Sequence, residues 1–189
     1  MKVFYCDTET TGLNPQKNDI IQLGYIIEID NQIREKGSIN VQPFDYNNIE
    51  SSALATHQIS IEQMKTFDSP RVVYNELINI LNKYINKYDR SDKFIPAGYN
   101  VKFDIEFLQN FFIKNRDKYY GAYFDYHFID AMALLFLKRY AGKINLSNYK
   151  LATASKHYGI EIQAHDALSD IEATRELILK MMEEITWNE

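Results

Sequence analysis

Residues 3–13 have the sequence VFYCDTETTGL, a short apolar run that leads directly into two acids and a glycine. The apolar part is typical of a buried strand. Side chains alternate along a strand, so Asp7 and Glu9 project from one face, about 6–7 Å apart. Two carboxylates on one face repel each other unless a cation lies between them. The segment therefore indicates either a metal site at the end of a strand or two acids that cap the turn at Gly12.

Two later segments place acids at the openings of predicted helices. Residues 97–104 have the sequence AGYNVKFD, and residues 165–170 have the sequence HDALSD. Asp104 follows a predicted strand where an acid suits the helix dipole, so on its own it favours a capping role. Four intervening residues put His165 at the mouth of the last helix and Asp170 about a turn inside it, so that both can face one cleft. By itself such a pair is more often a surface feature than a catalytic one.

Taken together, the acids indicate a divalent-metal site. Hard oxygen ligands from Asp7, Glu9, Asp104 and Asp170 suit Mg²⁺ or Mn²⁺, and the sequence lacks the Cys/His cluster of a structural zinc site. Two such ions about 3.5–4 Å apart can stabilise the attacking and leaving oxygens of a phosphoryl displacement. A histidine such as His165, with an ordinary pKa of about 6.5, can then take a proton from the attacking water.

The remaining pattern predicts an α/β fold. Strands precede an alternating strand–helix half, which favours a mixed sheet with hairpin strands first and crossover helices later, in one domain over residues 1–189. Asp130, at a strand–helix junction, is expected to cap a helix rather than to bind metal. The predicted strands are 3–6, 20–29, 33–41, 94–99 and a short one ending at 129, and the predicted helices are 69–85, 103–114, 131–140, 147–159 and 166–185.

Composition narrows the class of protein further. The 189 residues carry 26 acidic and 21 basic side chains, a net charge of −5, so no positive field over the whole molecule attracts a polyanion. The single cysteine excludes an intramolecular disulfide, and an early acid at Asp7 argues against a signal peptide. No apolar run approaches the length of a membrane span. We therefore expect a cytoplasmic protein without a membrane partner.

The middle third of the chain is nevertheless basic. Such a bias predicts either a surface that follows phosphates or a solvated helix face, and the sequence leaves both open. The basic residues are Lys102, Lys114, Arg116, Lys118, Lys138, Arg139 and Lys143.

Three motifs, Asp-x-Glu-Thr-Thr-Gly, Asn-x-x-Phe-Asp and His-x₄-Asp, occur in that order within residues 7–13, 97–108 and 165–174. They resemble the three exonuclease blocks of the DnaQ-like 3′–5′ exonucleases, and the histidine five residues before the last acid marks the DEDDh subclass. The resemblance implies a ribonuclease-H-like fold, a five-stranded mixed sheet flanked by helices. It also implies two divalent ions held by the four acids. The general base would be His165.

The same resemblance implies a site for the terminal nucleotide beside the first motif. The sequence departs from the family pattern at Gln58, Ser52 and Tyr99, where relatives carry a glycine, an acid and a histidine, respectively. These differences affect the shape of one loop and a sugar contact but leave the expected metal ligands unchanged. The implied substrate-binding residues are Thr10, Gly12, Leu13, His57 and Phe103.

The activity implied is metal-dependent removal of nucleoside 5′-monophosphates from 3′ ends of single-stranded nucleic acid, with DNA favoured over RNA. One alternative is a proofreading or assembly subunit that acts only with a DNA polymerase, similar to the epsilon subunit of bacterial DNA polymerase III. Another is an exoribonuclease resembling ribonuclease T, because the motifs do not distinguish the 2′-hydroxyl. The chain stops directly after the last predicted helix, so we expect a free-standing nuclease more than a replicase subunit.

Overall fold

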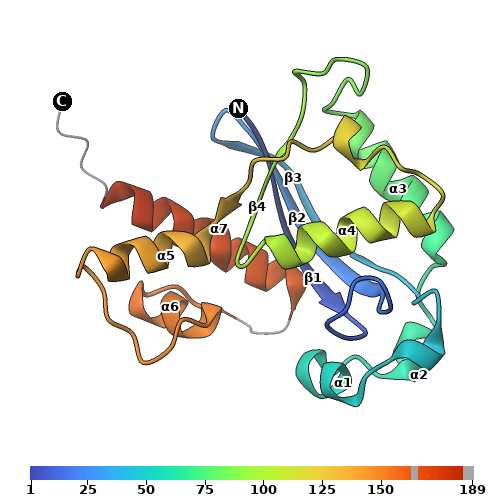
Figure 1. Cartoon of the computed structure of the whole chain (residues 1–189), viewed down its shortest axis with the longest axis horizontal. Helices are drawn as coiled ribbons and strands as arrows, with labels where there is room; N and C mark the ends of the chain where they lie inside the picture. The colour runs from blue at the N-terminus through green and yellow to red at the C-terminus, as the bar shows by residue number, and fades with distance from the viewer. Residues whose placement is uncertain (163–165, 185–189) are drawn as a thin grey trace.

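A five-stranded mixed sheet forms the centre of the fold (Figure 1), in a computed structural model that describes residues 1–162 and 166–184. The strand order is β3-β2-β1-β4-β5. The first three strands pair antiparallel, whereas β4 pairs parallel with both β1 and β5. The predicted mixed sheet is therefore confirmed. The strands are β1 (Lys2–Thr10), β2 (Ile20–Ile29), β3 (Gln32–Asn40), β4 (Ile95–Gly98) and β5 (Ile129–Asp130).

Helices cover both faces of this sheet, and alternate residues of β1 supply the two cores. Phe4 and Cys6 belong to the core under α3 and α4, while Val3 and Tyr5 belong to the core under α5, α6 and α7. The central strand is therefore apolar on both faces, as parallel pairing with covering helices requires. The principal helices are α3 (Pro70–Asn82), α4 (Lys102–Lys114), α5 (Ala131–Tyr140), α6 (Leu151–His157) and α7 (Ala167–Glu183).

The hairpin between β2 and β3 matches its prediction closely. Ile29 pairs with Gln32, so the turn has two central residues rather than the expected three. These residues, Asp30 and Asn31, have φ of 52° and 63°, which suits the right-handed twist of the flanking strands.

Two boundaries differ from the predictions by four residues each. The first strand extends beyond Cys6 to Thr10, because Thr8 and Thr10 continue the antiparallel pairing with β2. The helix expected from Ser147 begins only at Leu151, and the Asn148 side chain instead accepts bonds from the Lys150 amide and the Thr153 hydroxyl.

Two short helices between β3 and α3 were not predicted. They are α1 (Ser51–His57) and α2 (Ile61–Met64), and Figure 1 shows them beside the end of β1. None of the helices in the described parts of the chain is long and apolar enough to cross a bilayer.

A buried ion pair fastens α7 to the sheet. The Arg175 guanidinium donates to the Glu28 carboxylate of β2 at 2.6 Å from Nε and 2.5 Å from Nη2. Only 6% of the Glu28 side chain and 20% of the Arg175 side chain is exposed. Loss of one partner therefore leaves a charge with little access to water.

We expect Arg175→Leu to lower the free energy of unfolding by about 3 kcal/mol, because Glu28 would remain buried and charged. Urea unfolding followed by circular dichroism measures this. The double variant Glu28→Gln/Arg175→Leu should recover most of the loss, since it removes the stranded charge. Equal stability of Arg175→Leu and the wild type would contradict the assignment.

Candidate functional site

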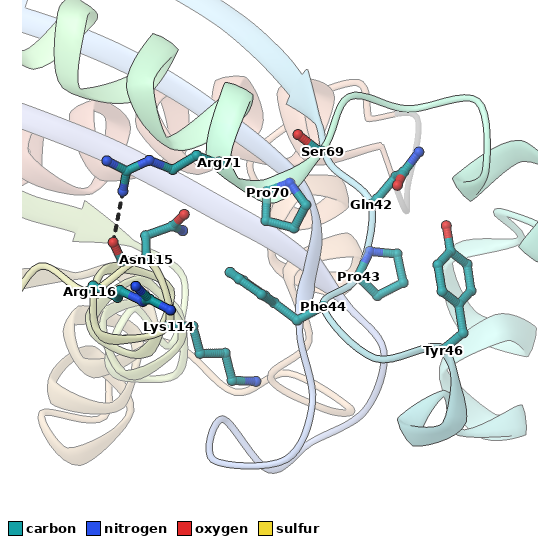
Figure 2. A pocket seen from close by; sticks show the side chains of 10 residues that line it. All are labelled: Gln42, Pro43, Phe44, Tyr46, Ser69, Pro70, Arg71, Lys114, Asn115 and Arg116. Carbon is teal, nitrogen blue, oxygen red and sulfur yellow. Dashed lines mark hydrogen bonds between the residues drawn. The ribbon is translucent and has the colours of Figure 1, made fainter.

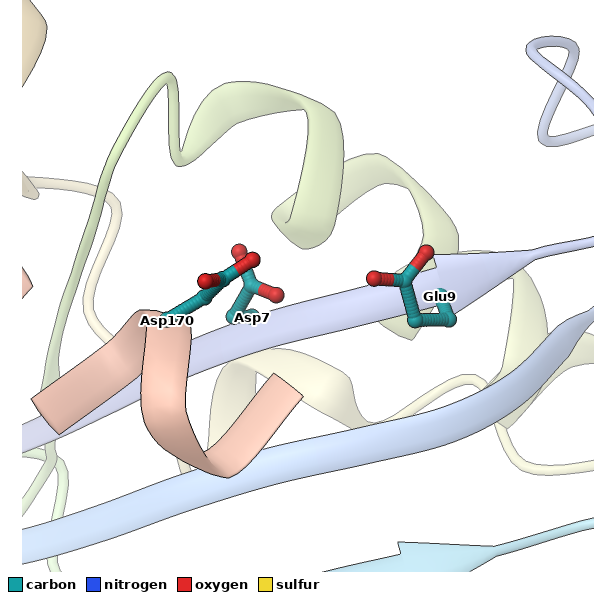
Figure 3. A group of neighbouring side chains, drawn as sticks. All are labelled: Asp7, Glu9 and Asp170. Atoms are coloured by element: carbon teal, nitrogen blue, oxygen red, sulfur yellow. The ribbon is translucent and has the colours of Figure 1, made fainter. Parts of the chain in front are cut away.

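Three carboxylates converge where β1 meets the first turn of α7. Each of Asp7, Glu9 and Asp170 offers an oxygen within 4.8 Å of the others. Figure 3 shows Asp7 and Glu9 on one face of β1 and Asp170 reaching toward them from α7. Alternation along the strand thus places the two β1 acids as predicted, and α7 supplies the third from the far end of the sequence.

The approach of α7 to the strands depends on a residue without a side chain. Asp7 pairs with Gly24 of β2, and a Cβ atom at Gly24 would lie 2.2 Å from the carbonyl oxygen of Ala167. Beside it, the Ala167 amide donates to the Gln22 side-chain oxygen at 3.1 Å. The start of α7 therefore rests on the backbone of β2, and this contact brings Asp170 to the β1 acids.

Burial and mutual repulsion oppose ionisation of the cluster. Burial, followed by the Asp104 and Asp170 charges, raises the pKa of Asp7 well above its ordinary value. Burial and the charges of Asp170 and Asp166 raise the pKa of Glu9 to about 7. Carboxylates held this close favour either protonation or a bound cation. The donor set, made of carboxylate oxygens alone, fits a hard divalent cation.

Asp104 lies beside this cluster but outside the group of mutually close oxygens. Its Oδ1 accepts bonds from the Thr8 amide at 2.9 Å and the Thr8 hydroxyl at 2.7 Å. The pairing of β1 with β4 ends at Tyr5, so Asp104 takes the place of a strand partner for Thr8. The helix-capping interpretation is wrong, because Val101 holds the N-cap position of α4 without a side-chain cap. Burial raises the pKa of Asp104 to about 7, although the Thr8 bonds oppose the rise.

The other predicted residues near the helix openings are accounted for individually. His165 lies outside the described residues, so its predicted role stays a prediction. Asp166 caps α7 by accepting from the Ser169 amide at 2.9 Å. Asp130 caps α5 through the Met132 and Ala133 amides, as predicted.

A pocket of about 280 Å³ adjoins the cluster and shares Glu9 with it. All five residues that were predicted to bind substrate line it, so the structure brings them together. Its lining consists of Thr8, Glu9, Thr10, Gly12, Leu13, Ser52, Ala53, Thr56, His57 and Phe103.

Hydrogen bonds hold the polar residues Thr10 and His57 of this pocket, whereas Leu13 is an exposed apolar residue of its lining. The Thr10 hydroxyl donates to the Gly12 carbonyl at 2.8 Å, which fixes the turn after β1. The buried His57 ring accepts the Ile59 amide at Nδ1, 3.0 Å away, so its neutral form carries the proton on Nε2. Leu13 is 77% exposed and offers apolar surface at the rim.

Several residues of the site were missed at the level of sequence. Ala53 and Thr56 come from α1, a single short helix that lacks a strong apolar period. Gly24 carried a usable signal, because a glycine inside a strand often marks a close approach of another backbone.

Comparison with known proteins gives a family and a fold. The family model described as Exonuclease matches residues 4–178. The chain is 26% identical over 181 residues to the PolC-type DNA polymerase III of Caldanaerobacter subterraneus subsp. tengcongensis, and 26% identical over 178 residues to that of Thermotoga petrophila. The two matches include 95% and 94% of this chain. They span only 11% and 12% of the length of the polymerases.

Solved structures of Escherichia coli exonuclease I are similar in fold. A complex with a dT13 oligonucleotide has a TM-score of 0.78 at 20% identity, covering 97% of this chain and 41% of that one. A zinc-bound complex with single-stranded DNA has a TM-score of 0.78 at 20% identity, covering 95% and 39%. The expected ribonuclease-H-like fold and the resemblance to exonucleases are confirmed at this level.

We expect Gly24→Ala to weaken divalent-metal binding about tenfold or more while the fold survives. The new Cβ would lie 2.2 Å from the Ala167 carbonyl, where real contacts are at least 3.0 Å, so the start of α7 must move by about 0.8 Å. Titration calorimetry with Mn²⁺ measures the affinity.

Gly37→Ala is the matched control, because the three atoms nearest to its Cβ would all belong to the Tyr25 side chain, at 3.1 Å or more. Unchanged Mn²⁺ affinity in a folded Gly24→Ala variant would contradict the positioning role.

Stability without metal should fall as pH rises from about 4.5 to about 7. The folded-state pKa of Glu9 is raised from 4.5 to about 7, so the folded protein holds a proton that the unfolded chain has lost. The stabilisation of the fold that comes from this protonated Glu9 is complete below pH 4.5 and is lost above pH 7. Thermal melts in chelator measure this decline, and Mg²⁺ should raise Tm more at pH 7.5 than at pH 5.5. A Glu9→Gln variant should show a shallower decline, and an unchanged slope would refute the assignment.

Proposed function

The chain belongs to the exonuclease family, and from that premise we propose that it hydrolyses single-stranded nucleic acid, with DNA preferred, from the 3′ end to nucleoside 5′-monophosphates. The observation that carries this proposal is the junction of the carboxylate cluster with the adjoining pocket through Glu9. A phosphodiester placed at that junction would meet the metal-binding oxygens while its terminal nucleotide occupies the pocket.

In this proposal Asp7, Glu9 and Asp170 hold divalent cations, two Mg²⁺ or Mn²⁺ ions, with Asp104 as the fourth ligand. When bound, the cations supply Lewis-acid stabilisation of charge on the phosphate oxygens. Electrostatic repulsion within the cluster supports this assignment, because burial and the neighbouring carboxylates raise the pKa values of both Asp7 and Glu9. His165 is proposed as the general base that takes the proton from the attacking water.

The pocket residues would orient the terminal nucleotide. Leu13 and Phe103 offer apolar surfaces against which a base can pack. His57 lines the same pocket, where its ring would contact a phosphate or sugar oxygen of the nucleotide. Holding the scissile bond in one orientation is the pocket's contribution to rate.

DNA is the preferred substrate class on the strength of the similar proteins. The matched relatives are DNA polymerases, and the similar exonuclease I structures hold DNA oligonucleotides. A ribonuclease resembling ribonuclease T is the alternative within the same chemistry.

A second candidate is a proofreading role beside a DNA polymerase, with or without activity in isolation. The observation that favours it is that nearly the whole chain matches a segment of PolC-type polymerases. Co-purification with a polymerase, and a rise in mismatch removal when the two are mixed, would support this candidate.

A time course on 5′-labelled single-stranded DNA and RNA of matched sequence tests the main proposal. We expect a ladder that shortens from the 3′ end with Mg²⁺ or Mn²⁺ and stops in chelator. Asp7→Asn and Asp170→Asn should each lower the rate by about 100-fold or more, because each removes a charged ligand.

Asp130→Asn is the matched control, since it changes a carboxylate at the start of another helix and asparagine is also a good cap. It should retain the wild-type rate. Appreciable cleavage by Asp7→Asn, or loss of cleavage in Asp130→Asn alone, would sink the assignment.

A further inference from the structure

A second, larger pocket of about 780 Å³ lies at the opposite end of α4. Figure 2 shows it between residues 42–46, the start of α3 and the C-terminal end of α4. Two aromatic rings, Phe44 and Tyr46, share its lining with Arg71, Lys114 and Arg116, and its lining residues include no acid. In a chain with a net charge of −5, this is a local concentration of positive charge.

The charge of the pocket comes from its two arginines. Lys114 is compensated, because its Nζ lies 2.6 Å from the Asp19 carboxylate. Arg71 donates to the Asn115 carbonyl at 2.8 Å, which orients the guanidinium without neutralising it. Within the described ranges, neither Arg71 nor Arg116 forms an ion pair with a carboxylate. Two positive charges are therefore available to an anionic ligand.

The loop that carries Phe44 is held in place from beneath. Asp19, 3% exposed, accepts from Lys114 with one oxygen and from the Asp45 amide with the other, at 3.1 Å. The Phe44 ring packs edge-on against Phe111 and remains 40% exposed. An aromatic surface fixed in this way can accept a stacked base with little loss of side-chain freedom.

We propose that this pocket binds a nucleotide of the substrate strand on the 5′ side of the terminal nucleotides. Arg71 and Arg116 engage its phosphate, and Phe44 stacks on its base. The proposal rests on the proposed function, because it assumes a strand whose 3′ end lies at the carboxylate cluster. Cationic surface beside an exposed aromatic ring is the usual means of binding single strands without sequence preference. Lys114 and Arg116 belong to the basic bias for which the sequence left two interpretations open, a surface that follows phosphates and a solvated helix face.

The α4 helix gives the separation of the two pockets. Phe103 lines the first and Lys114 the second, eleven residues apart, which is about 16 Å along a helix axis. At about 3.4 Å per nucleotide, the closest spacing in a stacked strand, this corresponds to at most about five nucleotides. The Asn110 side chain and Lys114 bind the 12–19 loop that lies between the pockets. At the same spacing a dinucleotide at the cluster spans only about 7 Å, which is less than half of this separation.

Substrate length tests the proposal. We would measure kcat/KM on oligonucleotides of two, four, six and eight residues that share one 3′ end. For the wild type, kcat/KM should rise with length and level off by about six residues. In Arg71→Gln/Arg116→Asn, the eight-residue substrate should lose roughly tenfold while the dinucleotide changes by less than about twofold.

The single variant Arg116→Asn tests the pocket with little risk of disturbing the fold. Arg116 has a φ of 63°, which asparagine tolerates, and no hydrogen bond or ion pair in the described part of the chain holds its side chain. Arg90→Gln is the charge-matched control on a different loop and should match the wild type at every length. An equal loss on all lengths, or no loss on any, would overturn the proposal.

Binding separates this proposal from the proposed activity. Fluorescence anisotropy with a labelled eight-residue strand in chelator should show weaker binding by the double variant. Its slope of log affinity against log salt should be smaller by about 0.7, for the one phosphate that the two arginines engage. Weakened binding without turnover in the wild type would leave the pocket standing and refute the activity. Turnover without dependence on length, and unchanged binding, would refute the pocket alone.

Discussion

The contact of the first turn of α7 with the bare backbone of β2 is the constraint on which the candidate site depends. Gly24 removes the side chain that would keep the two apart, and Gln22 accepts the first amide of the helix. The buried Glu28–Arg175 pair fastens the same helix farther along the same strand. These contacts fix the position of α7 on the sheet, and they place Asp170 beside Asp7 and Glu9. The acids of β1 then acquire their third neighbour.

The site is assembled against an electrostatic cost. Burial and like charges raise the pKa of Asp7 well above its usual range, and raise that of Glu9 to about 7. The rest of the fold must supply this energy, since no Lys or Arg neutralises these acids among the described salt bridges. Asp104 meets part of its own cost through two bonds from Thr8. A divalent cation held by these carboxylates would relieve the remaining repulsion, so metal binding and the stability of the fold would be linked.

Local pattern was enough to predict the hairpin, the principal helices and the two β1 acids. Residues 20–29 and 33–41 carry several β-branched side chains, and β2 and β3 fall within one residue of those limits. The bond between Asp104 and Thr8 could not be predicted, because it depends on β4 ending before β1 does. The helices α1 and α2 could not be predicted from the sequence either, because each is too short to show a periodic apolar pattern. The sequence pattern therefore predicted the type of the longer elements better than the contacts between residues that are distant in the sequence.

The clustered carboxylates Asp7 and Glu9 lie far from Asp170 in the sequence, so the three are not all synthesised at the same time. During synthesis, β1 and its two acids emerge before α7, which follows the other described elements in the sequence. A nascent chain thus carries an incomplete set of ligands until almost all of the sheet and its covering helices are in place.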